Sequence, residues 1–121
     1  MTFMEAVKSG LNKYADFSGR ATLSEFWWFF LFILLAGIGI GIIGGILTGI
    51  LGETIGLILI IGAMLALYVP YFAVSARRLH DIGKSGWWQL ISLVPFVGLV
   101  LIYFLVQSGQ AGDNQFGSPV A

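Results

Sequence analysis

Residues 26–51 read FWWFFLFILLAGIGIGIIGGILTGIL, a run without an ionisable side chain. At about 1.5 Å of rise per helical residue, the run exceeds the roughly 20 residues that an α-helix needs to cross a bilayer. Lipid offers no partner for open backbone groups, so an apolar run of this length must be helical in a membrane. The stretch therefore predicts a membrane-spanning helix and sets the fold class as all-α.

Two further charge-free runs, residues 54–76 and 87–106, are each close to one bilayer thickness. The composition agrees, because 58% of the 121 residues are hydrophobic and 10% are charged, whereas roughly a quarter of the residues of a soluble domain are charged. We therefore predict a single integral membrane domain over 1–121, with three transmembrane helices at about 26–51, 54–76 and 87–106 and a tail at 107–121.

Apolar side chains recur at helical spacing in residues 1–20, while charged side chains lie elsewhere on the same helical wheel. The apolar positions are Phe3, Met4, Val7, Leu11, Tyr14 and Phe17. This pattern predicts a short amphipathic helix in the membrane interface. A short helix that caps the bundle through the same face is the alternative. Thr22 and Glu25 have the spacing of a capping box at the start of the first span.

The positions of lysine and arginine predict which way the chain faces, because short loops rich in these residues stay in the cytoplasm. All six precede the first span or lie between the second and third: Lys8, Lys13, Arg20, Arg77, Arg78 and Lys84. We therefore expect the N-terminus and the loop at 77–86 in the cytoplasm. Three crossings then place the tail at 107–121 on the opposite, periplasmic or extracytoplasmic side, together with the turn at Glu53.

A glycine stripe runs along one face of the first span, with a glycine at every fourth residue: Gly37, Gly41, Gly45 and Gly49. Gly44 and Gly52 widen it. Small residues at this spacing mark helix contacts in membranes, because they let two backbones approach closely. The stripe predicts either packing inside the chain, against Gly62, Ala63 and Ala66 of the second span, or assembly of a homo-oligomer. A glycine-lined pore is a further alternative.

Two of the predicted spans open on a pair of tryptophans: Trp27 and Trp28, and Trp87 and Trp88. Indole rings prefer the headgroup level of a bilayer, so these four residues are predicted to anchor both helices at one membrane face. An aromatic cage around a cationic ligand is the alternative. Pro70 and Pro95 lie inside the second and third spans and predict kinks.

The stretch 76–88, ARRLHDIGKSGWW, holds three of the six positive charges and the only histidine. One histidine beside one carboxylate does not supply the three or four protein ligands of a zinc site. The glycine turn between His80 and Ser85 does not present these two side chains to each other, and no oxyanion donor is evident. We therefore predict no metal, no cofactor and no catalytic residue.

Three interpretations of these charges remain open. In the first, one polar cluster forms at the cytoplasmic ends of the spans from Arg20, Glu25, Arg77, Arg78, His80 and Asp81. In the second, Arg77, Arg78 and Lys84, with Arg20, bind an anionic lipid headgroup, since each basic residue near a negative leaflet contributes about 1 kcal/mol. In the third, the charges only set the topology.

A set of motifs links the chain to a known family. They are Tyr14, Phe17, Gly19 and Arg20 with Glu25, Phe26 and Trp27; residues 77–81 with 85–88; residues 95–98; and Gly112, Asn114, Phe116, Gly117 and Pro119. Over its full length the sequence resembles the small bacterial inner-membrane proteins catalogued as domain of unknown function 805. Residues 21–24 depart from the family pattern, in which further basic residues are common. The resemblance implies a bacterial inner-membrane location and brings no established activity.

The first hypothesis is therefore a small multi-pass membrane protein without enzymatic activity. It acts through interaction with membrane lipid, with further copies of itself or with an unknown membrane partner. A nucleic-acid partner is not expected, because no basic run interleaves with aromatics in a polar context. A small oligomeric transporter or channel is the alternative, although transport usually places ionisable groups inside the membrane. A membrane enzyme that uses residues 77–81 on a lipid comes third.

Overall fold

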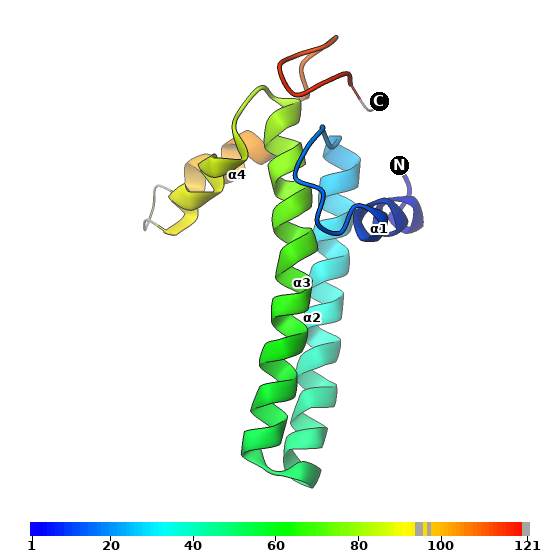
Figure 1. The fold of residues 1–121 in the computed structure, drawn as a ribbon, viewed down its shortest axis with the longest axis vertical. Coiled ribbons are helices and arrows are strands. Elements are labelled where there is room, and N and C mark those ends of the chain that lie inside the picture. The colour runs from blue at the N-terminus through cyan, green and yellow to red at the C-terminus, as the bar shows by residue number, and fades with distance from the viewer. Residues whose placement is uncertain (94–95, 97, 120–121) are drawn as a thin grey trace.

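A computed structural model describes residues 1–93, 96 and 98–119 of the chain. Over these residues the regular elements are helices: α1 (Phe3–Asn12), α2 (Leu23–Leu51), α3 (Glu53–Asp81), the 3₁₀-helix η1 (Gly86–Leu93) and α4 (Gly98–Leu105). Figure 1 shows α2 and α3 as a long antiparallel pair, with the shorter elements gathered around one end of it. The all-helical prediction is confirmed.

The helices α2 and α3 are both long and apolar enough to cross a membrane. Each has 29 residues, which at about 1.5 Å per residue is a length of about 44 Å. That length matches a bilayer with its headgroup regions, about 40–45 Å. Gly52 alone separates them, with a φ of 95° that favours glycine. The first two predicted spans are therefore long helices, and α3 continues past residue 76 to Asp81.

The predicted third span at 87–106 does not form the single helix that its apolar sequence suggested. It contains η1 and α4, each of 8 residues, and at about 1.5–2 Å per residue neither approaches the roughly 30 Å of the hydrocarbon core. Residues 94, 95 and 97, and with them the predicted kink at Pro95, lie outside the described residues. A proline in the middle of the run opposes a continuous helix, because it lacks an amide hydrogen and disfavours helical backbone before it.

The tail lies beside the end of α3, and this corrects the predicted topology. The amide of Gln110 donates to the carbonyl of Asp81 at 2.8 Å, and the amide of Asn114 donates from its side chain to the carbonyl of His80 at 2.9 Å. Groups in hydrogen-bond contact cannot lie on opposite sides of a bilayer. The prediction that the tail lies across the membrane from the loop at 77–86 is therefore wrong, and Figure 1 shows the N-terminus and the described part of the tail at the same end of the long pair.

The N-terminal helix is shorter than predicted, and only part of its predicted apolar face packs on the bundle. It ends at Asn12, begins with a capping box formed by Thr2 and Glu5, and contacts α2 through small residues such as Gly10, where an added Cβ would lie 2.3 Å from the ring of Phe29. On the predicted apolar face, Val7 is buried and the ring of Phe3 packs edge-on against Trp28, whereas Met4, Leu11 and Phe17 remain exposed. Part of that face therefore packs on the bundle, and an interfacial role for the exposed part stays a prediction.

A side chain from the loop after α1 completes the hydrogen bonding of α3. Pro70 lies inside α3 and has no amide hydrogen to give to the carbonyl of Ala66, four residues earlier. The hydroxyl of Tyr14 donates to that carbonyl. Tyr14, predicted on the amphipathic face of the first helix, instead lies beyond the helix end and ties the N-terminal segment to α3.

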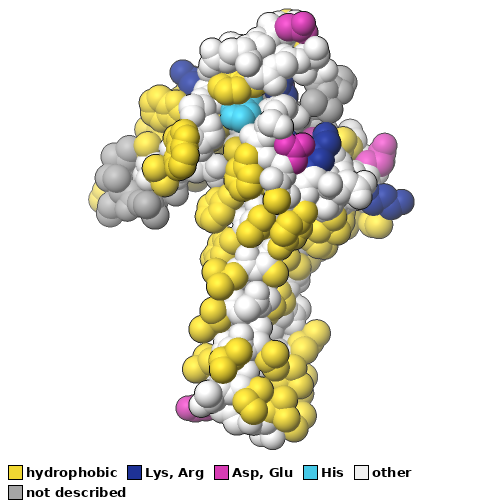
Figure 2. All heavy atoms as spheres, viewed as in Figure 1, with side chains coloured by type: hydrophobic (Ala, Val, Ile, Leu, Met, Phe, Trp, Pro, Cys, Tyr) yellow, Lys and Arg dark blue, Asp and Glu magenta, His cyan; other side chains and the backbone are white. Residues whose placement is uncertain are grey.

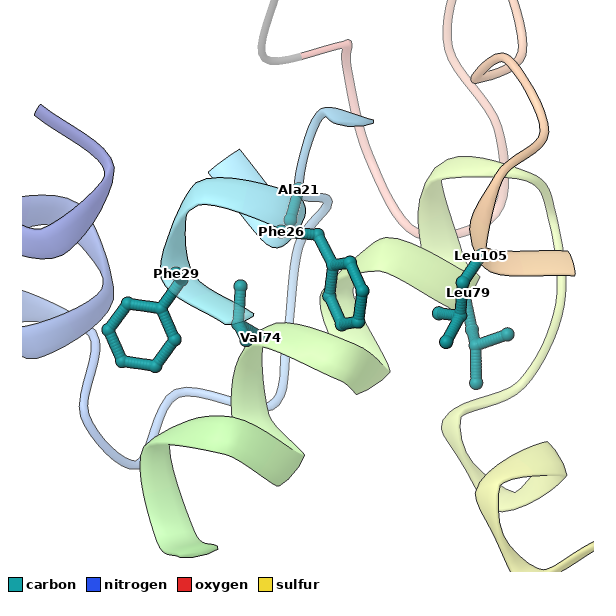
Figure 3. Packing of buried hydrophobic residues seen from close by; sticks show 6 residues of the cluster. All are labelled: Ala21, Phe26, Phe29, Val74, Leu79 and Leu105. Carbon is teal, nitrogen blue, oxygen red and sulfur yellow. The ribbon is translucent and has the colours of Figure 1, made fainter. Parts of the chain in front are cut away.

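The hydrophobic core lies at the end of the pair where the other elements gather. Figure 3 shows side chains from the start of α2, the end of α3 and the end of α4 converging there. The cluster comprises Ala21, Phe26, Phe29, Val74, Leu79 and Leu105, all at most 5% exposed. Farther along the pair, large apolar side chains face outward, as the hydrophobic surface in Figure 2 shows.

The glycine stripe packs against α3 only at Gly44. A Cβ added at Gly37, Gly41, Gly45 or Gly49 would meet no atom within 4 Å, whereas one at Gly44 would clash with Ile60. One added at Gly56 of α3 would clash with Thr48. The close approach of the two helices therefore uses Gly44, which widens the stripe, and the four glycines at every fourth residue do not take part in it.

Candidate functional site

Two ion pairs join α3 to the start of α2 and to the segment before it, and a third lies within α3. Asp81 pairs with Arg20 (Nε–Oδ1, 2.8 Å) and with Arg78 (Nη1–Oδ2, 2.5 Å). Arg77 pairs with Glu25 (Nη1–Oε1, 3.0 Å). We call these five residues the arginine cluster.

Every member of the arginine cluster is buried. The three arginines are 2% exposed or less, Glu25 is 0% exposed and Asp81 is 6% exposed. Buried charges are tolerated when they are paired and hydrogen-bonded. With three positive and two negative side chains, the ion pairs leave one positive charge in excess, and further acceptors are needed.

Backbone carbonyls supply those acceptors, and among the described residues half of them belong to the C-terminal tail at 107–121. The guanidinium of Arg20 donates to the carbonyls of Gln110 (2.5 Å), Gly112 (2.8 Å) and Gly117 (3.2 Å). Arg78 donates to the carbonyls of Leu105 and Gln107. The arginine cluster therefore holds the tail in place. The carbonyls of the tail stabilise the buried positive charge by accepting hydrogen bonds from it.

Local sequence explains how the first two residues of the cluster reach α3. The amide of Ala21 donates to the carbonyl of Arg77 at 2.9 Å, which places Arg20 beside Asp81. Thr22 accepts the amide of Glu25 at 3.1 Å and caps α2 as predicted. The carboxylate of Glu25 does not complete a capping box, because it accepts instead from the hydroxyl of Ser9 at 2.6 Å and from Arg77.

A turn before α2 supplies a further acceptor for Arg77, whose Nε donates to the carbonyl of Asp16 at 3.1 Å. The side chain and the amide of Ser18 both donate to the carboxylate of Asp16. These hydrogen bonds hold the pKa of Asp16 below its ordinary value. The turn is therefore fixed by its own polar groups.

The Arg77–Glu25 pair is the least satisfied part of the arginine cluster. Arg77 Nη2 and Glu25 Oε2 are buried side-chain atoms that have no hydrogen-bond partner among the described residues. Such atoms are costly in a protein interior. This pair is therefore expected to contribute less to stability than the pairs of Asp81.

His80 and Lys84 lie outside the ion pairs, although both were candidates from the sequence. The ring of His80 contacts the carbonyl of Gly19 through Nδ1 at 2.8 Å and stacks flat on Phe116, with centroids 4.0 Å apart. The ammonium of Lys84 lies over the rings of Trp88 and Phe104, 5.8 and 5.3 Å from their centroids. The structure therefore brings five of the seven predicted residues into buried ion pairs, which form two sets around Asp81 and Glu25.

The four tryptophans differ in their surroundings. The indole of Trp27 donates to the carbonyl of Leu105 at 3.2 Å and so fastens α4 to α2. Trp28 and Trp88 are each 40% exposed and Trp87 is 78% exposed. Membrane anchoring by these residues stays a prediction, and Trp27 has a packing role that the sequence did not reveal.

The tail residues that contact the cluster were not predicted as site residues. Most of them act through backbone carbonyls, which leave no side-chain pattern in a sequence. The available signal was the motif that carried the family resemblance, since it includes Gly112, Asn114, Phe116 and Gly117. Within the described ranges, no group of three or more His, Asp or Glu side chains is placed to hold a metal ion.

The buried charges are therefore used inside the molecule. An anionic headgroup would have to displace the internal partners of Arg20 or Arg78 to reach either guanidinium. The arrangement is that of a clamp, which holds the tail, the end of α3 and the start of α2 together.

Comparison with known proteins adds a family and two named relatives. The sequence pattern of the family described as "Protein of unknown function (DUF805)" matches residues 14–118. The chain is similar to inner membrane protein YhaH of Escherichia coli (strain K12), with 37% identity over 108 residues that cover 88% of each chain. It is also similar to inner membrane protein YhaI of the same strain, with 38% identity over 116 residues that cover 95% of this chain and 94% of YhaI. No solved structure matches the chain.

Proposed function

The chain belongs to the family described as "Protein of unknown function (DUF805)", and from that premise we propose that it is an inner-membrane protein that crosses the bilayer twice and acts through interaction. Its partners are membrane lipid, further copies of the chain or another membrane protein. The two relatives that are named inner membrane proteins support the location.

The proposed topology places both termini in the cytoplasm. The two long helices are the crossings, while α1 lies on one side of the pair and η1 and α4 lie on another, at the end that holds the termini (Figure 1). All six lysines and arginines lie in the segments at this end, and Glu53 lies at the far turn. Short segments rich in lysine and arginine stay in the cytoplasm, which supports this orientation.

The observation that carries the proposal is the unpaired apolar surface of the two long helices. Only 6% of the most apolar window of α2, and 17% of that of α3, is buried inside the chain. Helices in a membrane associate through close packing, and surface that does not pack is covered by lipid or by another protein. Because so little of these two helices is buried within the chain, most of their surface is exposed to lipid or to protein partners.

The glycine stripe is the face through which we propose that copies associate. Its four glycines are open to a partner, since an added Cβ at each would meet nothing within 4 Å. Gly39 is equally open but lies about 200° around the helix from Gly37, because successive residues are turned by about 100°. Gly39 therefore provides a matched control on the opposite face.

Native mass spectrometry from a mild detergent tests this function, because it reports copy number and retained lipid together. We expect an oligomer, retained lipid or both. If an oligomer is seen, Gly41→Leu should reduce it and Gly39→Leu should not. A lipid-free monomer would contradict the proposal.

Transport remains the competing class, and flux measured in proteoliposomes would favour it. The apolar runs at 26–51 and 54–76 contain no Asp, Glu, Lys, Arg or His, and transport pathways usually place such groups inside the membrane. We therefore do not propose it as the function.

A further inference from the structure

A cavity of about 330 Å³ opens beside the arginine cluster, between the loop before α2, the end of α3 and the start of η1. It is lined by Phe17, Ala76, His80, Ser85, Gly86, Trp87 and Gln89. No Lys, Arg, Asp or Glu is among these residues. Small-molecule sites have volumes of roughly 300–1,000 Å³ and combine apolar walls with a few placed polar groups. The volume of this cavity falls within that range, and its lining combines apolar side chains with a few polar ones.

His80 presents one ring nitrogen to this cavity. Its Nδ1 lies 2.8 Å from the carbonyl of Gly19, and a carbonyl only accepts, so Nδ1 carries the hydrogen. Its Nε2 points toward Gly86, where it would lie 3.7 Å from an added Cβ, and no hydrogen bond to it is found in the described part of the chain. In the neutral ring, Nε2 therefore offers a lone pair to whatever occupies the cavity.

The ring of His80 is held in this orientation from two directions. It stacks on Phe116 with an angle of 2° between the planes. The side-chain amide of Asn114 donates to the backbone carbonyl of His80 at 2.9 Å, and this fixes the tail segment that carries Phe116. Figure 2 shows the histidine colour reaching the surface at this end, next to hydrophobic side chains. The acceptor is therefore pre-organised.

Aromatic walls and a hydroxyl complete the cavity. Trp87 is 78% exposed and Phe17 is 48% exposed, so both rings have faces that a ligand can cover. The hydroxyl of Ser85 accepts the amide of Trp87 at 3.3 Å and retains its own hydrogen as a donor. The amide of Gln89 donates to the carbonyl of Phe72 at 3.2 Å, which holds η1 against α3.

We propose that this cavity binds the uncharged, hydroxyl-bearing ring of a membrane-soluble molecule, the chemical class to which quinol headgroups belong. A hydroxyl of the ring donates to Nε2 of His80, and the ring packs against Phe17 and Trp87. A charged headgroup would find no countercharge among the lining residues. This inference goes beyond the proposed function, and it does not depend on the number of copies that associate.

Calorimetric titration of the full chain in detergent with a short-tailed hydroquinone tests the binding. The control ligand is the dimethyl ether of the same hydroquinone, which keeps the ring and cannot donate a hydrogen bond. We expect the ether to bind about tenfold more weakly, the effect of one lost hydrogen bond to a buried acceptor. Equal affinities, or no binding of the hydroquinone, would overturn the proposal.

Substitutions locate the site. His80→Asn keeps a side-chain N–H for the carbonyl of Gly19 and removes Nε2, so hydroquinone should bind about tenfold more weakly. Trp87→Leu should also weaken binding. Trp28→Leu, at a 40% exposed tryptophan that does not line the cavity, should leave it unchanged. Unchanged affinity in His80→Asn, or equal losses in the two tryptophan variants, would overturn the assignment.

Two further measurements keep the result interpretable. Thermal unfolding in the same detergent identifies any variant that fails to fold, and the comparison of hydroquinone with its ether uses only the native chain. A short-chain monoacylglycerol, which has hydroxyls and no ring, should compete poorly. A monoacylglycerol that competes as well as the hydroquinone would overturn the ring as the recognised group.

Discussion

The two ends of the long helical pair differ in which side chains they bury and which they expose. At the end that holds the termini, charged side chains are inside: Arg20, Arg78 and Glu25 are at most 2% exposed. Toward the far turn, apolar side chains such as Ile42 and Ile58 are outside and more than 60% exposed. A charge is buried where ion pairs and carbonyls surround it, and an apolar side chain is exposed where the surrounding medium is hydrocarbon.

The difference shows where the stability of the isolated chain resides. The end with the termini holds the hydrophobic core and the ion pairs, so the fold is fixed there. The rest of α2 and α3 has few internal contacts and relies on the membrane or on partners. Substitutions at the two ends of the pair test this difference in stability.

The largest effect is expected for Asp81→Asn. Arg20 and Arg78 would then lose their shared carboxylate while remaining buried, and breaking a buried pair in this way costs about 3–5 kcal/mol of unfolding free energy. Chemical unfolding in detergent, followed by circular dichroism, measures it. Asp113→Asn, at an exposed acid in the tail, is the control and should change little. An equal effect of the two variants would show that the arginine cluster does not hold the fold.

A smaller effect is expected for Glu25→Gln. The amide oxygen can still accept from Ser9, but the charge that faces Arg77 is lost, which should lower the unfolding free energy by about 2 kcal/mol. The same unfolding assay applies. A loss larger than that of Asp81→Asn would contradict the ranking of the two ion pairs, which rests on the unpartnered atoms Glu25 Oε2 and Arg77 Nη2.

Tyr14→Phe tests the hydrogen bond that replaces the one Pro70 removes. Loss of the hydroxyl leaves the carbonyl of Ala66 without its donor, and we expect a loss of about 1 kcal/mol. The matched control is Tyr103→Phe, at a tyrosine that is 61% exposed. If Phe at residue 14 costs no more than Phe at residue 103, the loop after α1 is not tied to α3 in this way.

The smallest effect is expected for Ile58→Ala, because this side chain is 64% exposed and should lose less than about 0.5 kcal/mol in detergent. Ile60→Ala, two residues away, removes the side chain that packs on Gly44 and should cost about 1–2 kcal/mol. The pair separates surface that packs within the chain from surface that faces its surroundings. Equal losses would place internal packing on both sides of α3.

The parts of the fold that follow from local composition could be predicted from the sequence. The charge-free runs at 26–51 and 54–76 became α2 and α3, because a helix of that length satisfies all its own backbone groups. The run at 87–106 has a similar composition but does not form one helix. A central proline alone does not explain the difference, because Pro70 lies inside the continuous helix α3, where Tyr14 donates to the carbonyl that Pro70 leaves free. A count of apolar residues does not register such contacts from other segments, and this is why the third span and the side of the tail were mispredicted.

The arginine cluster could be predicted only in part, for a related reason. Arg20, Arg77, Arg78 and Asp81 form a distinctive pattern, and the sequence suggested that they meet. The partners that neutralise them are carbonyls of the tail, such as those of Gln110 and Gly112. Every residue has a carbonyl, so its use in a long-range contact cannot be detected in a single sequence.

The tail contacts of Arg20 also constrain the order in which the molecule is assembled during translation. Gly112 and Gly117 follow both long helices along the chain, so their carbonyls leave the ribosome after α2 and α3 have been made. Until then Arg20 lacks several of its acceptors, and the nascent protein carries an incompletely solvated charge beside its core. This end can therefore close only after the segment that contains Gly112 and Gly117 has been synthesised.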